Sequence, residues 1–98
     1  PLTVETIRQM HVPSSHYRIS ANRYEAGVAF PGATRAGRLY VLSGACSRKV
    51  GEWRAQLQAG MFVDFPAGSF EFKVLGEQQV QLVNVWLIPE EYRAKRDA

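Results

Sequence analysis

The apolar and polar positions along this chain of 98 residues follow, for most of its length, the pattern of short β-strands. Segments rich in β-branched or aromatic side chains alternate with short segments that favour turns. The predicted strands cover residues 17–19, 24–30, 39–42, 53–57, 61–65, 70–75 and 80–88. Short strands at such regular spacing are typical of an all-β sandwich or barrel.

Glycine or proline stands between most of these strands and marks where the chain is expected to reverse. Glycine accepts positive φ and proline fixes φ, so each such site favours a turn. The predicted turns contain Pro31-Gly32, Ser43-Gly44, Val50-Gly51, Ala59-Gly60, Pro66-Ala67-Gly68 and Leu75-Gly76. These regularly spaced turns support a compact arrangement of antiparallel strands.

Helical features occur only at the C-terminal end, in residues 89–98. Pro89 suits the first position of a helix, and Glu90 and Glu91 suit its first turn, whereas basic residues follow later. That order of charges complements the helix dipole. The residues after Pro1 show no helical period. The later segment that holds His11, His16 and the stretch Pro13-Ser14-Ser15 is predicted to be a loop or the entry to an edge strand.

The composition indicates one domain that covers residues 1–98. An apolar fraction of 46% is sufficient for a core, and the charged fraction of 21% is ordinary for a folded protein. The net charge of +3 comes from scattered arginines without the dense basic run of a nucleic-acid tail. We therefore expect no nucleic-acid partner.

Three further features narrow the expected environment. Cys46 is the single cysteine, which excludes an internal disulfide and predicts a small buried apolar side chain. The longest nearly apolar run, residues 80–89, is too short to cross a bilayer, so no membrane association is expected. With no secretory signal pattern at its start, the chain is predicted to be cytoplasmic.

One stretch resembles a known sequence motif. Gly60 is followed after five residues by Pro66, then by Gly68, and after two more residues by Glu71. This spacing is similar to the second motif of the cupin family, and residues 37–44 resemble the end of its first motif. The resemblance implies a small double-stranded β-helix barrel, jelly-roll-like and often paired into a homodimer. The short C-terminal helix predicted from residues 89–98 would follow this barrel.

The metal ligands of that family do not carry over to this chain. By the resemblance, Gly37 stands at the glutamate position, residues 30–34 contain no histidine, and Glu71 stands at the last histidine position. A transition-metal site needs three or four converging imidazole or carboxylate ligands. His11 and His16 precede the motifs at a spacing that suits no helix or strand face, and we expect them to be structural or on the surface. No metal and no cofactor are predicted.

The resemblance also places a candidate pocket. It implies that Glu71 points into the barrel, and strand alternation then adds Lys73 on the same side. Arg35 or Arg38 is expected to reach Glu71, either as a purely structural ion pair or as part of a site where arginine binds a carboxylate or phosphate.

Aromatic and amide side chains complete the candidate pocket. Asn84 interrupts the apolar segment 80–88 and should share one strand face with Leu82 and Trp86. A buried amide there is either satisfied within the protein or in contact with a ligand. Tyr40 and Trp86 are candidate walls, although a small barrel also needs large side chains simply to fill its interior.

Two functions follow, and the sequence leaves both open. The first is a metal-independent cupin-fold protein that binds a small polar or anionic molecule in the barrel cavity. The alternative is a metal-independent isomerase or lyase in which Glu71 is the general acid or base on a sugar-like or keto-acid substrate. An interaction protein that uses an exposed sheet face is a third hypothesis.

Overall fold

The computed structural model describes the backbone of residues 1–97 and the side chains of residues 1–93. Two helices and one 3₁₀ turn flank eight strands. In chain order the elements are α1 (Val4–Met10), η1 (Ser14–His16), β1 (Tyr17–Tyr24), β2 (Ala29–Thr34), β3 (Gly37–Ser43), β4 (Ala45–Val50), β5 (Trp53–Gln58), β6 (Phe62–Phe65), β7 (Gly68–Leu75), β8 (Val80–Leu87) and α2 (Glu90–Asp97).

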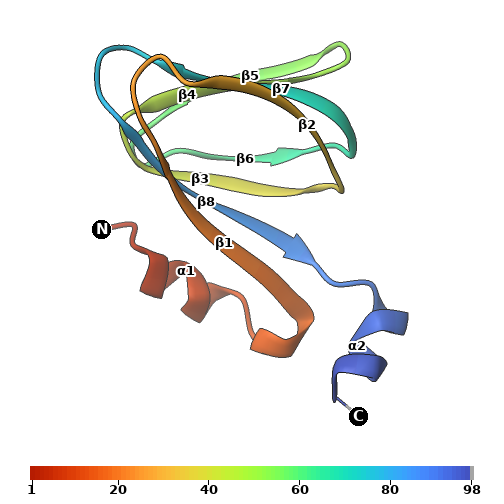
Figure 1. Ribbon diagram of the computed structural model, residues 1–98. Coiled ribbons are helices and arrows are strands. Elements are labelled where there is room, and N and C mark those ends of the chain that lie inside the picture. The colour runs from red at the N-terminus through yellow and green to blue at the C-terminus, as the bar shows by residue number, and fades with distance from the viewer. Residues whose placement is uncertain (98) are drawn as a thin grey trace.

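The strands form two antiparallel sheets of four strands each that face one another (Figure 1). Sheet A has the order β1-β8-β3-β6, and sheet B has the order β2-β7-β4-β5. Every pairing within the two sheets is antiparallel. The chain crosses repeatedly from one sheet to the other, so strands adjacent in sequence often lie in different layers.

The all-β class is confirmed, but the expected closed barrel is not formed. Across the described strands, the ladders end at β1 and β6 in sheet A and at β2 and β5 in sheet B. A barrel would need further hydrogen-bonded pairs between those edges. The architecture is therefore two facing sheets with open edges.

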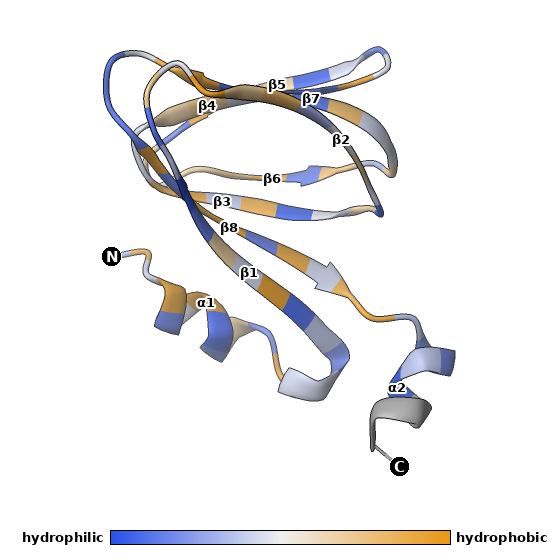
Figure 2. Ribbon diagram, in the orientation of Figure 1, coloured by the Kyte–Doolittle hydropathy of each residue, from blue (hydrophilic) through white to orange (hydrophobic). Residues whose placement is uncertain are grey.

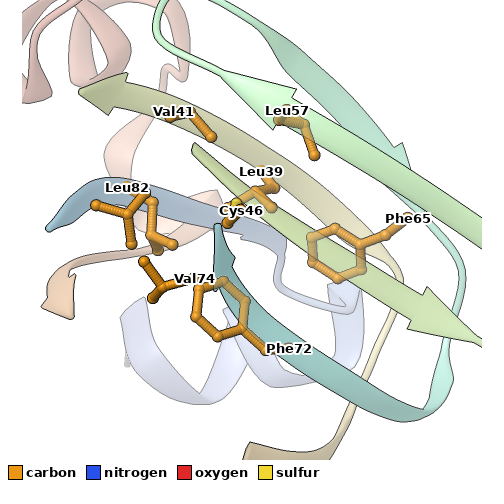
Figure 3. Packing of buried hydrophobic residues seen from close by; sticks show 9 residues of the cluster. Leu39, Val41, Cys46, Leu57, Phe65, Phe72, Val74 and Leu82 are labelled. Carbon is orange, nitrogen blue, oxygen red and sulfur yellow. The ribbon is translucent and has the colours of Figure 1, made fainter. Parts of the chain in front are cut away.

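The main core fills the space between the sheets (Figure 3). Leu39 and Leu82 contribute from sheet A, whereas Cys46, Phe72 and Val74 contribute from sheet B. Cys46 is completely buried, which confirms its predicted role as a small apolar side chain. Its burial raises the pKa of the thiol to about 11, so it stays protonated at neutral pH.

A second apolar cluster lies on the opposite face of sheet A, beneath α1. Ile7 of the helix is completely buried against Tyr40, Val83 and Val85. Figure 1 shows α1 lying across this face, and Figure 2 shows apolar and hydrophilic residues on different sides of the helix. Sheet A is thus covered on both faces, whereas the outer face of sheet B is open to solvent.

The helix α1 contradicts the expectation that only residues 89–98 favour a helix. It begins with a capping box, in which the Thr3 side chain accepts from the Thr6 backbone N–H and the Thr6 hydroxyl accepts from the Thr3 backbone N–H. The helix has only seven residues, so a helical period is hard to detect from one buried position. The predicted C-terminal helix is confirmed by α2 over its described residues, and Ala98 lies outside them.

Three further predictions were wrong. Strand β4 was missed altogether, and Pro31-Gly32 lies inside β2 rather than in a turn. The predicted strand 24–30 runs across a turn, because β1 ends at Tyr24 and β2 begins at Ala29. Pro31 lacks an N–H donor, but β2 is an edge strand, where one side of the backbone needs no partner. No helix among residues 1–97 is long and apolar enough to cross a membrane.

Candidate functional site

The residues predicted to form one pocket lie in four separate places. Sheet A carries Arg38 and Tyr40 on its outer face and Asn84 on its inner face, whereas Glu71 and Lys73 lie on the outer face of sheet B. The remaining two residues meet at the end of the sheets, and they are Arg35 and Trp86.

Strand β7 alternates as expected, but its faces are reversed relative to the expectation for Glu71. Phe72 and Val74 are buried in the inter-sheet core with Phe70 packed against them, whereas Glu71 and Lys73 are exposed. Glu71 forms no ion pair with any described side chain, and neither Arg35 nor Arg38 reaches it. The predictions that Glu71 points into the interior and that Arg35 or Arg38 pairs with it are therefore wrong.

Glu71 and Lys73 instead line a shallow groove of about 760 Å³ on the outer face of sheet B. The strand register places Glu71 beside Lys49 and Lys73 beside Ser47, with Arg54 next to Lys49. Three cations thus share this face with one carboxylate. The groove is open to water, which screens these charges.

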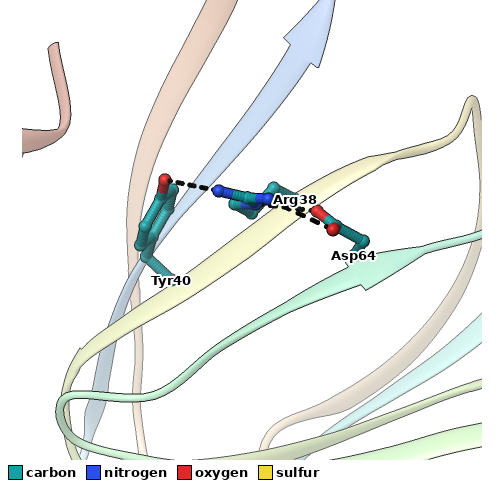
Figure 4. A network of polar contacts seen from close by, with 3 residues as sticks. All are labelled: Arg38, Tyr40 and Asp64. Carbon is teal, nitrogen blue, oxygen red and sulfur yellow. Dashed lines mark hydrogen bonds and ion pairs between the residues drawn. The ribbon is translucent and has the colours of Figure 1, made fainter. Parts of the chain in front are cut away.

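Arg38 has a carboxylate partner, but the partner is Asp64 rather than Glu71 (Figure 4). Arg38 Nε donates to Asp64 Oδ1 at 2.7 Å, and Nη2 donates to Oδ2 at 3.2 Å. Arg38 Nη1 also donates to the Tyr40 hydroxyl at 3.5 Å, and its Cζ lies 4.5 Å from the centroid of the Phe62 ring. The two-pronged pair raises the pKa of Arg38 and lowers the pKa of Asp64.

The Arg38–Asp64 pair predicts a small pH-dependent contribution to stability. Because the pKa of Asp64 is lowered by folding, its contribution is present above the unfolded pKa of about 3.9 and is lost as pH falls through the folded value. Asp64 is mostly exposed, so Asp64→Asn should lower the free energy of unfolding by no more than about 1 kcal/mol at pH 7. Urea denaturation at neutral pH and at about pH 2 measures this, and the difference should vanish in acid.

A matched control for that prediction is Glu25→Gln, which changes a turn carboxylate without an ion pair among the described side chains. This variant should unfold like the parent protein at both pH values. An Asp64→Asn difference that persists unchanged in acid would contradict the assigned role of the ion pair.

The ends of β1, β2 and β8 meet α2 around a cleft of about 550 Å³. We call it the rim cleft, and it is lined by Arg18, Ala33, Thr34, Arg35, Trp86, Leu87, Ile88, Pro89 and Tyr92. Trp86 Nε1 donates to Thr34 Oγ1 at 3.0 Å and so joins the two sheets at this end. No carboxylate is among the lining residues that the structure describes.

Each arginine of the rim cleft lies over an aromatic ring. Arg18 Cζ is 5.8 Å from the Trp86 ring centroid, and Arg35 Cζ is 5.5 Å from the Tyr92 ring centroid. Both arginines are exposed, and neither forms an ion pair with a described side chain. Two cations beside two rings can bind the charge and the flat body of an anionic molecule together.

Asn84 lies deeper between the sheets, on the same face of β8 as Leu82 and Trp86, as its position in the strand predicted. It is only 6% exposed, and its Oδ1 has no hydrogen-bond partner in the structure. The neighbouring strand places Ser20 opposite Asn84, and the Ser20 hydroxyl accepts from Asn22 Nδ2 at 2.9 Å. Asn84 is therefore a buried polar group with spare acceptor capacity.

The residues present do not fit the metal centre that the resemblance implies. Among the described residues, no three histidine, cysteine, aspartate or glutamate side chains converge. The inward positions Gly32 and Gly37 are instead covered by rings, since a Cβ at Gly32 would overlap Phe70 and a Cβ at Gly37 would lie 2.8 Å from both Phe65 and Trp86. Apolar contacts therefore replace coordination chemistry at these positions.

The two histidines lie apart from this region. His11 Nδ1 donates to the Ile7 carbonyl oxygen at 2.7 Å, and its ring packs edge-on against Tyr17 and Tyr40. This placement near the end of α1 agrees with the expected structural role. His16 lies in η1, half-buried.

Sequence reasoning missed three residues of interest, Arg18, Tyr92 and Arg48. The first two required knowledge of how the ends of β1 and α2 come together at the rim cleft. Arg48 lies on β4, the strand that was not predicted, and it is almost completely buried. A signal was present, because Arg48 lies two residues from both Cys46 and Val50 and so shares their strand face.

No protein-family profile and no curated protein sequence matches this chain. Solved structures do resemble it. The Cupin_2 domain of an XRE family transcriptional regulator from Enterobacter cloacae has a TM-score of 0.68 at 13% identity, over 79% of this chain and 86% of that one. The Cnp3 cupin domain of Schizosaccharomyces pombe has a TM-score of 0.67 at 14% identity, over 89% and 65% of the respective chains.

A de novo designed double-stranded β-helix is also similar, with a TM-score of 0.58 at 12% identity, over 68% of this chain and 95% of the design. Identities this low carry information about the fold alone. The facing antiparallel sheets and these neighbours agree with the double-stranded β-helix that the resemblance implied, without the closure into a barrel. The chain is a small domain with the fold of the cupin superfamily.

Proposed function

We propose that this cupin-fold protein binds a small anionic molecule with a flat or cyclic body, and that it does so in the rim cleft without a metal. The observation that carries the proposal is the pair of arginines, Arg18 and Arg35, each set over a ring in a cleft lined by no described carboxylate. Guanidinium groups bind carboxylates and phosphates in two-pronged fashion, and the rings supply an apolar wall.

The hydrogen bond between Trp86 and Thr34 supports a preformed site. It fixes the indole of sheet A against the end of sheet B, so the ring is held before a ligand arrives. Preorganisation lowers the entropic cost of binding. The proposal differs from the sequence-based expectation in its place, because the cleft lies at the end of the sheets rather than deep inside a barrel.

The alternative function, catalysis by Glu71, has less support. It required a carboxylate enclosed in a cavity and next to an arginine, whereas Glu71 is exposed on the outer face of sheet B. Isomerase or lyase chemistry therefore stays a prediction, and Glu71→Gln in an activity screen tests it.

The rim cleft is tested by the fluorescence of Trp86. In a Trp53→Phe background Trp86 is the sole tryptophan, so a change in emission reports on the cleft directly. Titration with benzoate, a flat monoanion, should change this emission, and Arg35→Gln should raise the dissociation constant by about tenfold or more. Arg18→Gln should have a similar effect.

The matched control is Arg23→Gln, on the same strand as Arg18 but outside the cleft. It removes one positive charge without removing a lining residue and should leave the affinity within about twofold. Equal effects of Arg23→Gln and Arg35→Gln would show attraction by net charge alone and would overturn the assignment of the rim cleft.

A further inference from the structure

Arg48 is the most unusual charged residue of the fold, because it is buried without a counter-charge. Its side chain is 5% exposed and lies between two rings, with Cζ 4.6 Å from the Phe65 centroid and 4.9 Å from the Phe70 centroid. It forms no ion pair with any described side chain. By contrast, the more exposed Arg38 has a two-pronged carboxylate partner.

Contacts with rings do not satisfy this guanidinium. Nε and Nη1 of Arg48 are both buried, and neither has a hydrogen-bond partner in the structure. These two nitrogens lie on different edges of the planar group, so each edge offers an N–H donor. Buried donors without acceptors cost free energy, and a buried charge without a partner costs more. Arg48 is therefore a buried cation with two donors that no described protein acceptor uses.

An entrance to Arg48 lies at Phe70. The Phe70 ring contacts Arg48 on its inner side, is half-buried, and also lines an open cleft of about 620 Å³. Gly32 and Gly51 line the same cleft. Arg48 itself lines the neighbouring groove of about 760 Å³. A rotation of the Phe70 ring would open a route from the cleft to the guanidinium.

The charges at the entrance limit what can pass. Lys49, Glu52 and Glu71 all line this outer cleft, so two carboxylates face one ammonium. Two nearby negative charges repel multiply charged anions most strongly. Such an entrance opposes a dianion more than a monoanion, so a small carboxylate with one negative charge is the anion that it opposes least, and the buried guanidinium supplies the attraction.

We propose that Arg48 forms a second binding site, between the sheets and separate from the rim cleft, for the carboxylate of a small monoanion that enters past Phe70. The carboxylate would accept from the unpartnered Nε or Nη1 and supply the missing counter-charge. Phe65 and Phe70 would exclude water from the pair, which strengthens its electrostatic attraction.

The direct test observes the Nε–H signals of arginine by ¹H–¹⁵N NMR while acetate is added at constant ionic strength. Arg48→Lys and Arg38→Lys assign the two signals by their loss. Acetate should shift the Arg48 signal in a saturable way, whereas the Arg38 signal, already paired with Asp64, should not move. An Arg48 signal that stays unmoved while the protein remains folded would overturn the proposal.

Variants give an independent readout by thermal unfolding. Acetate should raise the melting temperature of the parent protein. Arg48→Met should raise the dissociation constant for acetate by about tenfold or more. Arg23→Met, on β1 of sheet A, removes an exposed cation that lines none of the grooves and clefts described above and should leave the response unchanged. Retention of the full acetate response in Arg48→Met would contradict the site.

The proposals for the rim cleft and for Arg48 can be contradicted independently of each other. Arg35→Gln should leave the response of the Arg48 signal to acetate unchanged, because Arg35 lines only the rim cleft. Loss of both responses in Arg35→Gln would merge the sites into one and would overturn the proposal of a separate site at Arg48. If Arg48→Met does not fold, the NMR titration of the parent protein still decides the question.

Discussion

Phe72→Ala should destabilise the fold by about 3–5 kcal/mol, close to the whole stability of a domain of this size. Phe72 is 2% exposed in the centre of the inter-sheet core, with its ring centroid 5.2 Å from that of Tyr24 and 5.1 Å from that of Phe30. Removal of the ring leaves a cavity that the paired strands around it are unable to close. Urea denaturation followed by circular dichroism measures the loss.

The neighbouring residue supplies the control for this prediction. Glu71 is on the same strand but on the solvent face, so Glu71→Gln should change the free energy of unfolding by no more than about 0.5 kcal/mol. The pair of variants tests which face of β7 is buried. A costly Glu71→Gln combined with a tolerated Phe72→Ala would mean that β7 has the opposite facing, as the sequence motif had implied.

Gly44→Ala should cost about 2–4 kcal/mol, from two additive causes. Gly44 has φ +76°, which disfavours a side chain, and a Cβ there would overlap the Gln79 carbonyl oxygen and lie 2.9 Å from Val80 Cα. Both obstacles belong to the backbone, so a change of side-chain rotamer does not relieve them. The expected result is a lower midpoint of urea denaturation with an unchanged m-value.

Gly76→Ala separates the two causes. Gly76 has almost the same φ, +77°, but no heavy atom within 4 Å of the position of its Cβ. It should therefore cost only about 1 kcal/mol, the price of the left-handed conformation alone. Equal losses in the two variants would show that crowding at Gly44 contributes nothing and that the turn rather than the contact with Gln79 controls stability.

The fold class was predictable from the sequence because side-chain alternation and glycine turns are local signals. Strand β4 was missed for a local reason too, since an arginine occupies an inward position between Cys46 and Val50. The same arginine therefore hides the strand from the sequence pattern and places an unpartnered charge in the interior. Helix α1 was missed because it is short and its start is marked by the threonines of a capping box rather than by a long apolar period.

The candidate site was harder to predict because it depended on which face of β7 is buried. The motif resemblance assigned Glu71 to the interior, whereas the apolar pattern of Phe70, Phe72 and Val74 favoured the opposite face. Burial of two rings outweighs burial of one carboxylate, so the apolar pattern prevails. The rim cleft joins Arg18 and Arg35 through chain topology, which no local pattern records.

The burial of sheet A on both faces has a consequence for motion. Strand β8 lies between β1 and β3 with α1 on one side and the inter-sheet core on the other, and its residues 82–85 are all buried. We therefore expect amide groups there to exchange with solvent only when most of the domain opens, and those of sheet B, which has one solvent-exposed face, to exchange through smaller openings. Because sheet B carries the buried guanidinium, the layer that would have to open to admit a ligand is also the layer expected to open at lower cost.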